Sequence, residues 1–336
     1  MDNGSGGFME DLVFYGGGTA LNTGNQQWTS RNLTFYNCNT AIFQNWNWVY
    51  TYKSLFIHDC DVGINMTQGG NVITTGSITL QDSVMTNIRV AGILTTFSTN
   101  STPISGGTLV VDNVDFVGTP NAITYPDGTV ILPGNTHVPS FIQGRAYTAY
   151  DAQTHIGNLT CYQPTANYSR VQQLVNAPPK ARSLLTPTGT IYERSKPQFE
   201  GFPLGSIVSI IDYGCPSDGA TDATECVQNF FNSIQEDHLA FIDHGAYVIR
   251  DTIQIPNNIK MVGEIWPLFM IDGSSPTFSD VNNPRPAFRV GNPGDVGAVE
   301  MTDIIFETLG PAPGAILMEW NLAATEQGSN GTICLH

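Results

Sequence analysis

Short apolar runs recur along the first 125 residues of the chain. Five three-residue runs have apolar residues at their first and third positions and follow one another at steps of 21, 22, 23 and 31 residues. Each run shows the alternation of a β-strand, whose successive side chains point to opposite faces. The runs are residues 12–14, 33–35, 55–57, 78–80 and 109–111. We predict that they are strands in equivalent positions of a repeating structure.

A small residue followed by an aliphatic residue comes after every run. These pairs are Ala20 with Leu21, Ala41 with Ile42, Gly63 with Ile64, Gly92 with Ile93, and Ala122 with Ile123. The pattern lacks the consensus asparagine and the helical return segment of leucine-rich repeats, and Gly, Asn and Asp separate its runs. It therefore predicts a parallel β-helix, in which each coil stacks about 4.8 Å above the last and buries its inward side chains against its neighbours.

Residues in equivalent positions of successive coils should lie directly over one another. The segments 37–46 and 59–68, NCNTAIFQNW and DCDVGINMTQ, match class for class at a spacing of 22 residues. Cys38 and Cys60 should therefore have Cα atoms about 4.8 Å apart, which suits either a disulfide or a stack of two buried thiols. We also expect one column of stacked turn-forming side chains at the corner after the runs: Asn37, Asp59, Asp82 and Asn113.

The repeat stops near residue 160, and a proline-rich connection follows. It carries five of the thirteen basic residues of the chain: Arg170, Lys180, Arg182, Arg194 and Lys196. A connection of this length exceeds the usual loop within one domain. We therefore divide the chain into a first unit, residues 1–160, a linker, residues 161–205, and a second unit, residues 206–336.

The second unit should open with one short helix. Val227, Phe230, Phe231 and Ile234 fall at helical spacing, and Asp222 with Glu225 resembles a capping box. Cys215 and Cys226 flank the turn before this helix and are a candidate disulfide pair. Residues 301–306 and 315–316 then repeat the pattern of residues 9–14 and 20–21. The sequence thus predicts an all-β fold of two tandem parallel β-helices.

Charge restricts the choice of ligand. Thirteen Lys and Arg against 29 Asp and Glu give a formal charge of −16, which repels nucleic acids, anionic membranes and polyanionic polysaccharides. We therefore expect a neutral ligand and no nucleic-acid or membrane partner. We also expect a monomer. The six histidines show no metal-ligand spacing, and no nucleotide-binding glycine fingerprint is present, so we expect no metal and no cofactor.

The sequence also bears on location. No apolar run approaches the roughly 18 residues of a membrane span, and the first 30 residues do not resemble a signal peptide. Glycosylation sequons are nevertheless dense, which favours an extracellular protein. They begin at Asn3, Asn32, Asn65, Asn100, Asn158, Asn167 and Asn330.

Long motifs across nearly the whole chain resemble those of glycoside hydrolase family 55, the fungal exo-β-1,3-glucanases. They read DNGSGGFMEDLVFYGG, GNQQWTSRNLTFYNCNTAIFQNWNW, VSIIDYGCPSDGATDATE, GEIWPLFM and VGNPGDVGAVEMTDIIFETLGPAPGAILMEWN. DYGCPSDGATD alone indicates only the broader pectate-lyase-like superfamily. The resemblance implies two tandem right-handed parallel β-helices, a glucan site in a cleft between them, an extracellular location, and hydrolysis of terminal β-1,3-linked glucose with inversion.

Members of this family are longer, so the resemblance also implies that this chain is a fragment. The family's general acid is a Glu on later coils of the second β-helix, and Glu326 lies outside that motif. We therefore expect no glucanase activity from this chain alone. The alternative is a non-catalytic β-glucan-binding or structural β-helix.

The same resemblance suggests roles for a few side chains. The GNQQ motif makes Gln27, with Gln26 as second choice, a candidate for positioning the attacking water, although either could be an ordinary hydrogen-bonded corner amide. Trp320, Trp46 and Trp48 are candidate platforms for sugar rings, because the apolar face of glucose stacks on indole. The alternative for each tryptophan is a packing role in the β-helix wall.

Overall fold

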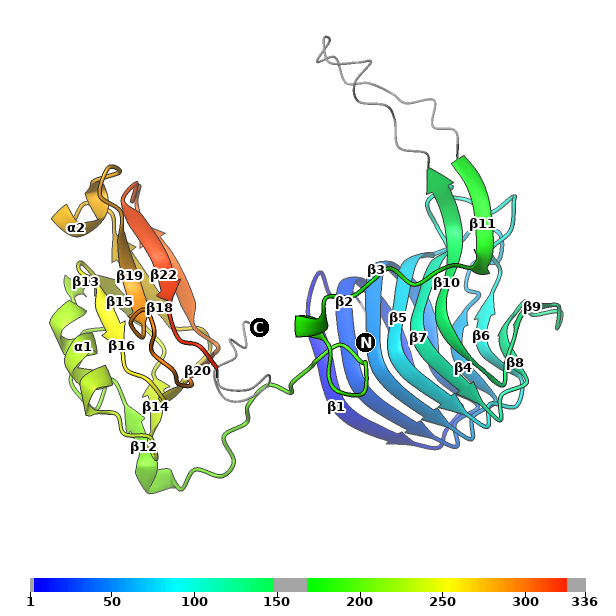
Figure 1. Ribbon diagram of the computed structural model, residues 1–336, viewed down its shortest axis with the longest axis horizontal. Coiled ribbons are helices and arrows are strands. Elements are labelled where there is room, and N and C mark those ends of the chain that lie inside the picture. Colours follow the sequence, from blue (N-terminus) through cyan, green and yellow to red (C-terminus); the bar gives the residue numbers. More distant parts are fainter. Residues whose placement is uncertain (1–2, 148–167, 325–336) are drawn as a thin grey trace, which may run out of the picture. The chain divides into compact units, whose positions relative to one another are not determined.

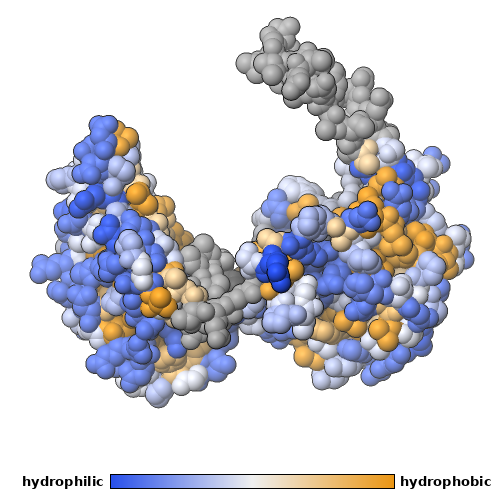
Figure 2. All heavy atoms as spheres, viewed as in Figure 1, coloured by the Kyte–Doolittle hydropathy of each residue, from blue (hydrophilic) through white to orange (hydrophobic). Residues whose placement is uncertain are grey.

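The computed structural model describes residues 3–147 and 168–324 (Figure 1). The chain divides into two compact units, unit 1 with residues 1–191 and unit 2 with residues 192–336. Nearly all regular structure in both units is β-strand, as predicted for an all-β class. Among the described residues, no helix is long and apolar enough to cross a membrane. Hydrophilic side chains cover most of the surface visible in Figure 2, with smaller apolar patches between them.

Unit 1 is a stack of mostly parallel strands. Strands β1, β2, β3, β5 and β7 pair in parallel in that order, and the shorter β4, β6 and β8 continue a second parallel row from β3. Figure 1 shows the strands side by side in this order. Their bounds are β1 Phe8–Tyr15, β2 Thr19–Tyr36, β3 Thr40–His58, β4 Val62–Met66, β5 Thr75–Thr86, β6 Ala91–Thr95, β7 Thr108–Val117 and β8 Asn121–Thr124.

Antiparallel strands cover the last coil of this stack. Strand β9 (Val130–Pro133) pairs with β8, and β10 (Thr136–Tyr147) pairs with β7. Strand β11 (Tyr168–Leu174) then pairs with β10, also antiparallel. The parallel repeat therefore ends near residue 124, earlier than the sequence predicts. The covering strands satisfy backbone groups that a parallel edge would leave open.

The predicted column of aliphatic residues is present in unit 1. Successive members are direct partners in the parallel registers, and all are at least 94% buried. The column consists of Leu21, Ile42, Ile64, Ile93 and Ile123. The two glycines among the small residues before them leave room for the neighbouring coil: a Cβ on Gly63 would lie 2.5 Å from the carbonyl oxygen of Gly92, and one on Gly92 would lie 2.5 Å from the Phe116 ring.

The predicted stacking of the five three-residue apolar runs is wrong after the third run, residues 55–57. Leu33 pairs with Leu55 as expected, but Ile78 pairs with Tyr50 rather than with Leu55. The next partner of Ile57 is Met85, 28 residues on. The loop between β4 and β5 absorbs the additional residues. The sequence pattern could not show this shift, because each long strand carries two inward-facing apolar runs.

The corner residues form two columns instead of the predicted one. Asn37 and Asp59 lie in a corner column with Asn87, whereas Asp82 and Asn113 belong to the corner that precedes the second half of each long strand. The side chain of Asn113 donates to Asp82, and that of Asn87 donates to Asp59. All five residues have φ between 47° and 58°. Asn and Asp tolerate this left-handed conformation better than most residues.

Unit 2 is built from three parallel sheets. The chain passes through them in the same order on successive turns, and the sheets are β12-β14-β17-β20, β13-β15-β18-β21 and β16-β19-β22. Its own apolar core fills the space between them. The bounds are β12 Ile207–Ser209, β13 Asp218–Asp222, β14 Leu239–Ile242, β15 Ala246–Ile249, β16 Ile253–Ile255, β17 Lys260–Gly263, β18 Leu268–Asp272, β19 Arg285–Val290, β20 Glu300–Thr302, β21 Ile305–Leu309 and β22 Ala315–Trp320.

Two α-helices and two short 3-10 helices complete the described structure. Helix α1 (Thr224–Ser233) buries Val227, Phe230 and Phe231, as the spacing predicts. The predicted capping box is wrong, because Asp222 accepts the backbone N–H and the hydroxyl of Thr224, at 3.0 and 2.6 Å, and Ala223 is the N-cap. The remaining helices are α2 (Pro276–Ser279), η2 (Arg182–Leu184) and η3 (Leu204–Ser206).

Basic side chains of the predicted linker make ion pairs within the unit to which each belongs. In unit 1, Lys180 Nζ lies 2.7 Å from Asp112 Oδ1. In unit 2, Lys196 Nζ lies 2.6 Å from Asp303 Oδ2, and Arg194 pairs with Glu300. The middle of the predicted linker is thus attached to unit 1, and its later part is attached to unit 2.

Candidate functional site

Gln26 and Trp48 occupy equivalent positions on adjacent strands of unit 1. The residues on both sides of Gln26 pair with those on both sides of Trp48 in the parallel register of β2 and β3. Trp48 is 58% exposed, and Gln26 is partly buried. An amide and an indole ring therefore lie next to each other on one wall of the stack.

Gln27 and Trp46 extend this wall. Gln27 is exposed and lies opposite Val49, which is itself 51% exposed. Trp46 lies opposite Gly24, where the register shifts at a bulge, and its side chain is partly buried. Bulges redirect side chains relative to the regular strand. The structure thus brings the four predicted unit 1 residues together, with Trp48 offering more exposed ring than Trp46.

Buried asparagines support the wall from inside. Asn47 Oδ1 accepts the backbone N–H groups of Gly76 and Ser77, at 2.8 and 3.0 Å. Asn25 lies opposite Asn47 and accepts the N–H of Gly4 at 3.0 Å. These bonds tie neighbouring coils together and hold the strands that carry the exposed amides and indole. The side-chain nitrogens of both asparagines are buried without a partner among the described residues.

Two stacked tyrosines complete the interior behind the wall. The rings of Tyr50 and Tyr52 lie 4.3 Å apart, and Tyr52 donates to Gln44 Oε1 at 2.7 Å. Tyr50 shares a 2.9 Å hydroxyl hydrogen bond with Ser30. Burial raises the pKa of Tyr50 to about 12 and also raises the pKa of Tyr52. Both phenols therefore stay neutral at physiological pH and act as hydrogen-bonding groups.

Sequence reasoning missed Trp28, whose ring lies under the N-terminal segment. A Cβ on Gly4 would lie 2.8 Å from the ring, and one on Gly7 would lie 2.5 Å from it. Trp28 is partly buried. Gly4 and Gly7 of the NGSGG motif therefore allow close approach of the backbone to the indole, and they were the available signal for this contact.

Trp320 belongs to unit 2 and packs against its core. It lies in β22 opposite Val290 and is partly buried. The neighbouring Glu319, also missed in the sequence, accepts hydrogen bonds from Asn321 (2.8 Å) and Arg289 (2.9 Å). These bonds lower the pKa of Glu319 below its ordinary value. Glu319 is therefore suited to remain ionised and not to act as a general acid.

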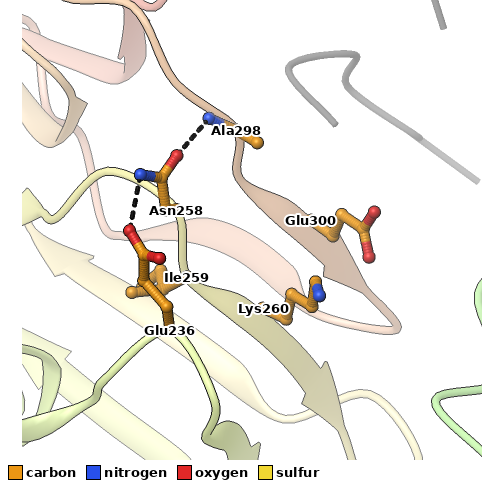
Figure 3. Close-up of a pocket in the computed structure, with 6 residues that line it drawn as sticks. All are labelled: Glu236, Asn258, Ile259, Lys260, Ala298 and Glu300. Atoms are coloured by element: carbon orange, nitrogen blue, oxygen red, sulfur yellow. Dashed lines mark hydrogen bonds between the residues drawn. The ribbon is translucent and has the colours of Figure 1, made fainter. Parts of the chain in front are cut away.

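A polar pocket of about 180 Å³ opens in unit 2 (Figure 3). Asn258 donates to Glu236 at 2.8 Å and accepts the backbone N–H of Ala298 at 2.9 Å. Lys260 and Glu300 lie on the opposite side of the same pocket in Figure 3. Glu300 is occupied by its ion pair with Arg194. The pocket therefore has carboxylates, but both already have partners.

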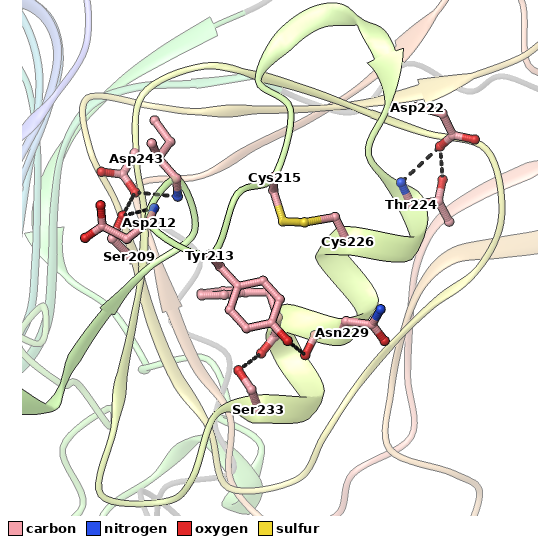
Figure 4. The surroundings of a disulfide bond; sticks show 12 residues. Ser209, Asp212, Tyr213, Cys215, Asp222, Thr224, Cys226, Asn229, Ser233 and Asp243 are labelled. Atoms are coloured by element: carbon pink, nitrogen blue, oxygen red, sulfur yellow. Dashed lines mark hydrogen bonds between the residues drawn. A yellow bond between two sulfur atoms is a disulfide. The ribbon is translucent and has the colours of Figure 1, made fainter.

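The four cysteines that the structure describes fall into two different states. Cys215 and Cys226 form a disulfide that joins the turn after β12 to helix α1 (Figure 4). Cys38 and Cys60 are free and buried, so the structure has the stack of thiols and not the disulfide. Among the described residues, no group of three or more His, Cys, Asp or Glu is arranged to hold a metal ion. Glu326 and the sequons at Asn158, Asn167 and Asn330 lie outside the described residues.

Comparison with known proteins gives relatives over the whole chain. A probable glucan endo-1,3-beta-glucosidase of Arthroderma benhamiae is 38% identical over 416 aligned positions, covering 100% of this chain and 47% of the relative. A glucan 1,3-beta-glucosidase of Cochliobolus carbonum is 34% identical, with coverage of 96% and 39%. A non-secreted LysM effector, LysM19 of Penicillium expansum, is 30% identical, with coverage of 98% and 26%. The chain thus spans less than half the length of these relatives.

A family model confirms the class of fold. The model described as rhamnogalacturonase A/epimerase, pectate lyase-like, matches residues 1–65. The strand-rich structure and this match over the first part of unit 1 agree with an all-β fold similar to that of pectate lyases. Along nearly its whole length, the chain is similar to glucan 1,3-beta-glucosidases, the class of enzyme to which its motifs pointed.

Proposed function

We propose that this chain is part of a protein that acts on β-1,3-glucan, and that the wall of unit 1 contacts the polysaccharide. The observation that carries the proposal is the position of Gln26 beside the exposed ring of Trp48. An indole can stack on the apolar face of a glucose ring, while an amide can both donate to and accept from its hydroxyls. The names of the two glucosidase relatives supply the substrate class.

The architecture we propose for this function is two tandem right-handed parallel β-helices. The parallel registers of unit 1 and the three recurring sheets of unit 2 support this description. Stacked coils present side chains of equivalent positions in straight rows. A row of this kind suits an extended polymer such as a glucan chain.

For the complete protein we propose hydrolysis with inversion, in which Gln27 or Gln26 positions the attacking water. An inverting glycosidase also needs a carboxylic acid with a raised pKa. Hydrogen bonds lower the pKa of five described carboxyl groups and so favour their ionised form; these are Asp127, Asp218, Asp272, Asp295 and Glu319. An amide orients water but is too weak a base to deprotonate it. We therefore infer that this chain by itself binds glucan without hydrolysing it.

The second candidate is a non-catalytic β-glucan-binding protein. The position of Gln26 beside the exposed ring of Trp48 fits this candidate as well as it fits part of an enzyme. Activity of the longer natural protein distinguishes the two: glucose release from laminarin supports the enzyme, and binding without release supports the binding protein. In both cases the partner is a neutral glucan and the chain is a monomer.

We also propose an extracellular location. The disulfide between Cys215 and Cys226 supports it, because such bonds persist in oxidising compartments. The sequons at Asn3, Asn32 and Asn100, which are exposed in the structure, are consistent with glycosylation there.

Calorimetric titration with laminarihexaose tests the role of the wall. The Trp48→Ala variant should bind at least tenfold more weakly than the wild type, which corresponds to about 1.4 kcal/mol. Val117→Ala, which truncates a similarly exposed apolar residue at the end of β7, is the matched control and should bind as the wild type does. Equal affinity of wild type and Trp48→Ala would remove Trp48 from the site. Release of glucose from laminarin by this chain would contradict the absence of an acid.

A further inference from the structure

The turn between β17 and β18 exposes two large apolar side chains in an unfavourable backbone conformation. Ile265 is 73% exposed and Trp266 is 60% exposed. Their φ angles are 49° and 59°. Positive φ is a genuine outlier for a β-branched residue, and Trp266 is further restricted by the proline after it. Gly or Asn would satisfy such a turn at lower conformational cost.

The base of this turn is held rigidly by its neighbours. Pro267 is buried, and its carbonyl accepts the N–H of Ile305 at 3.0 Å. The N–H of Glu264 donates to the carbonyl of Ile242 at 2.8 Å. A Cβ on Gly263 would lie 2.1 Å from the carbonyl oxygen of Asp303. The coils on both sides therefore impose the conformation of the tip.

Polar groups surround the apolar tip. The backbone N–H of His244 donates to Glu264 Oε2 at 3.2 Å, and the His244 ring lies within hydrogen-bonding distance of the Ile265 carbonyl. His244 and Glu264 are both exposed. On the adjacent coil of the same corner, Asp243 accepts the hydroxyl of Ser209 (Figure 4). The corner thus combines an exposed indole with hydrogen-bonding groups at its edge.

Folding does not account for the two side chains at the tip. An indole that is 60% exposed gains little from burial, and Ile265 gains less. Strain of this kind persists where the surrounding structure imposes it, and it is concentrated at functional sites. A rigid aromatic side chain also loses little conformational entropy when a ligand binds to it.

We propose that this corner of unit 2 is a further carbohydrate-binding surface, with Trp266 as the platform and His244 and Glu264 as partners for sugar hydroxyls. The ligand is a neutral glucan, because Glu264, Asp243 and the overall charge of −16 disfavour anionic polymers. A hexose ring has one apolar face and a polar rim, which matches the chemistry of the corner. The choice of β-1,3-linked glucan rests on the proposed function.

The test observes the indole N–H signals of the full chain by nitrogen-15 NMR. The chain has five tryptophans, and the variants Trp266→Phe and Trp48→Phe identify the signals of the two residues that matter. The protein is titrated separately with laminarihexaose, cellohexaose and maltohexaose. We expect the Trp266 signal to shift saturably with laminarihexaose.

Each outcome bears on one of the two proposals. If the Trp48 signal shifts but the Trp266 signal stays fixed with all three sugars, the corner is not a carbohydrate-binding surface. The proposed function is then unaffected. A Trp266 shift with cellohexaose or maltohexaose, and no shift of either signal with laminarihexaose, supports a carbohydrate surface and contradicts the β-1,3-glucan assignment. Absence of any Trp266 shift overturns the inference.

A variant pair separates binding from folding. Trp266→Ala should weaken laminarihexaose binding at this corner by at least fivefold. Because the variant lacks the indole, the affinity is read from the backbone signals of His244 and Glu264. The melting temperature should stay within about 2 °C of the wild type. Leu204→Ala truncates an apolar residue that is 88% exposed and should change neither quantity. A large loss of thermal stability in Trp266→Ala alone would show that the indole is structural and overturn the proposal.

Discussion

The backbone N–H of Cys38 donates to the sulfur of Cys60 at 3.4 Å, so the two residues are joined across adjacent coils as free thiols. Both are at least 99% buried in the core of unit 1. They pack there as small apolar side chains, which is common for cysteines without a partner. Burial raises the pKa of the Cys60 thiol from 9.0 to about 11.

This raised pKa predicts a loss of stability at alkaline pH. Below about pH 9 the thiol of Cys60 is protonated in both the folded and the unfolded chain, so it adds no pH dependence. Between about pH 9 and pH 11 the unfolded chain loses this proton while the folded chain keeps it. The free energy of unfolding should therefore fall as pH rises through this window, as measured by urea titrations at a series of pH values.

The Cys60→Ala variant is the control for this prediction, because it removes the thiol and leaves the tyrosines unchanged. The difference between wild type and variant should be constant below pH 9 and should shrink toward pH 11. A difference that does not change with pH would show that the thiol has an ordinary pKa in the folded protein.

The disulfide between Cys215 and Cys226 should stabilise unit 2. It closes a loop with a sequence separation of 11. Loops of this size correspond to roughly 2–3 kcal/mol of stabilisation in the chain-entropy account. The double variant Cys215→Ala with Cys226→Ala should therefore melt at a lower temperature than the wild type in calorimetry. A reducing agent should lower the melting temperature of the wild type only; an equal effect on both proteins would speak against the bond.

Asn47 should be among the residues of unit 1 that are most sensitive to truncation. Its side-chain oxygen accepts two backbone N–H groups of the next coil, and the residue is 3% exposed. Asn47→Ala should cost about 2–4 kcal/mol of unfolding free energy, because each buried donor left unsatisfied costs about 1–3 kcal/mol. Asn39→Ala, at an exposed corner, should change the value by less than about 0.5 kcal/mol. If Asn47→Ala and Asn39→Ala lose equal unfolding free energy in denaturant titrations, the hydrogen bonds of Asn47 do not stabilise the stack as proposed.

The corner column makes a distinct prediction for Asn113. Its φ is 58°, and its side chain donates to Asp82. Asn113→Ala loses the hydrogen bond and places a Cβ in a left-handed conformation, so it should cost about 2 kcal/mol in total. Asn113→Gly loses only the hydrogen bond, so its loss of unfolding free energy should be roughly half that of Asn113→Ala. Thermal unfolding of both variants measures this; if Gly is no better than Ala, backbone conformation is not what selects the residue.

Much of the candidate wall could be predicted from the sequence, but its exposure could not. The motif GNQQ and the repeat pointed to Gln26 and Gln27, and NWNW pointed to Trp46 and Trp48. The parallel register then places Gln26 beside Trp48. Whether an indole is a platform or a packed wall depends on which neighbours cover it, and local sequence does not contain that information. For the same reason Glu319, Trp28 and Trp266 were missed.

The pattern of residues along the chain was enough to predict the β-rich class, the column from Leu21 to Ile123 and the helix that buries Phe230 and Phe231. These features depend on residues close together in the chain or on a constant spacing between coils. Contacts between distant parts of the chain set three further features: the run that stacks on Leu55, the two columns of corner residues, and the reduced state of Cys38 and Cys60. These outcomes depend on loops of unequal length and on hydrogen bonds between distant strands, which a one-dimensional pattern does not specify.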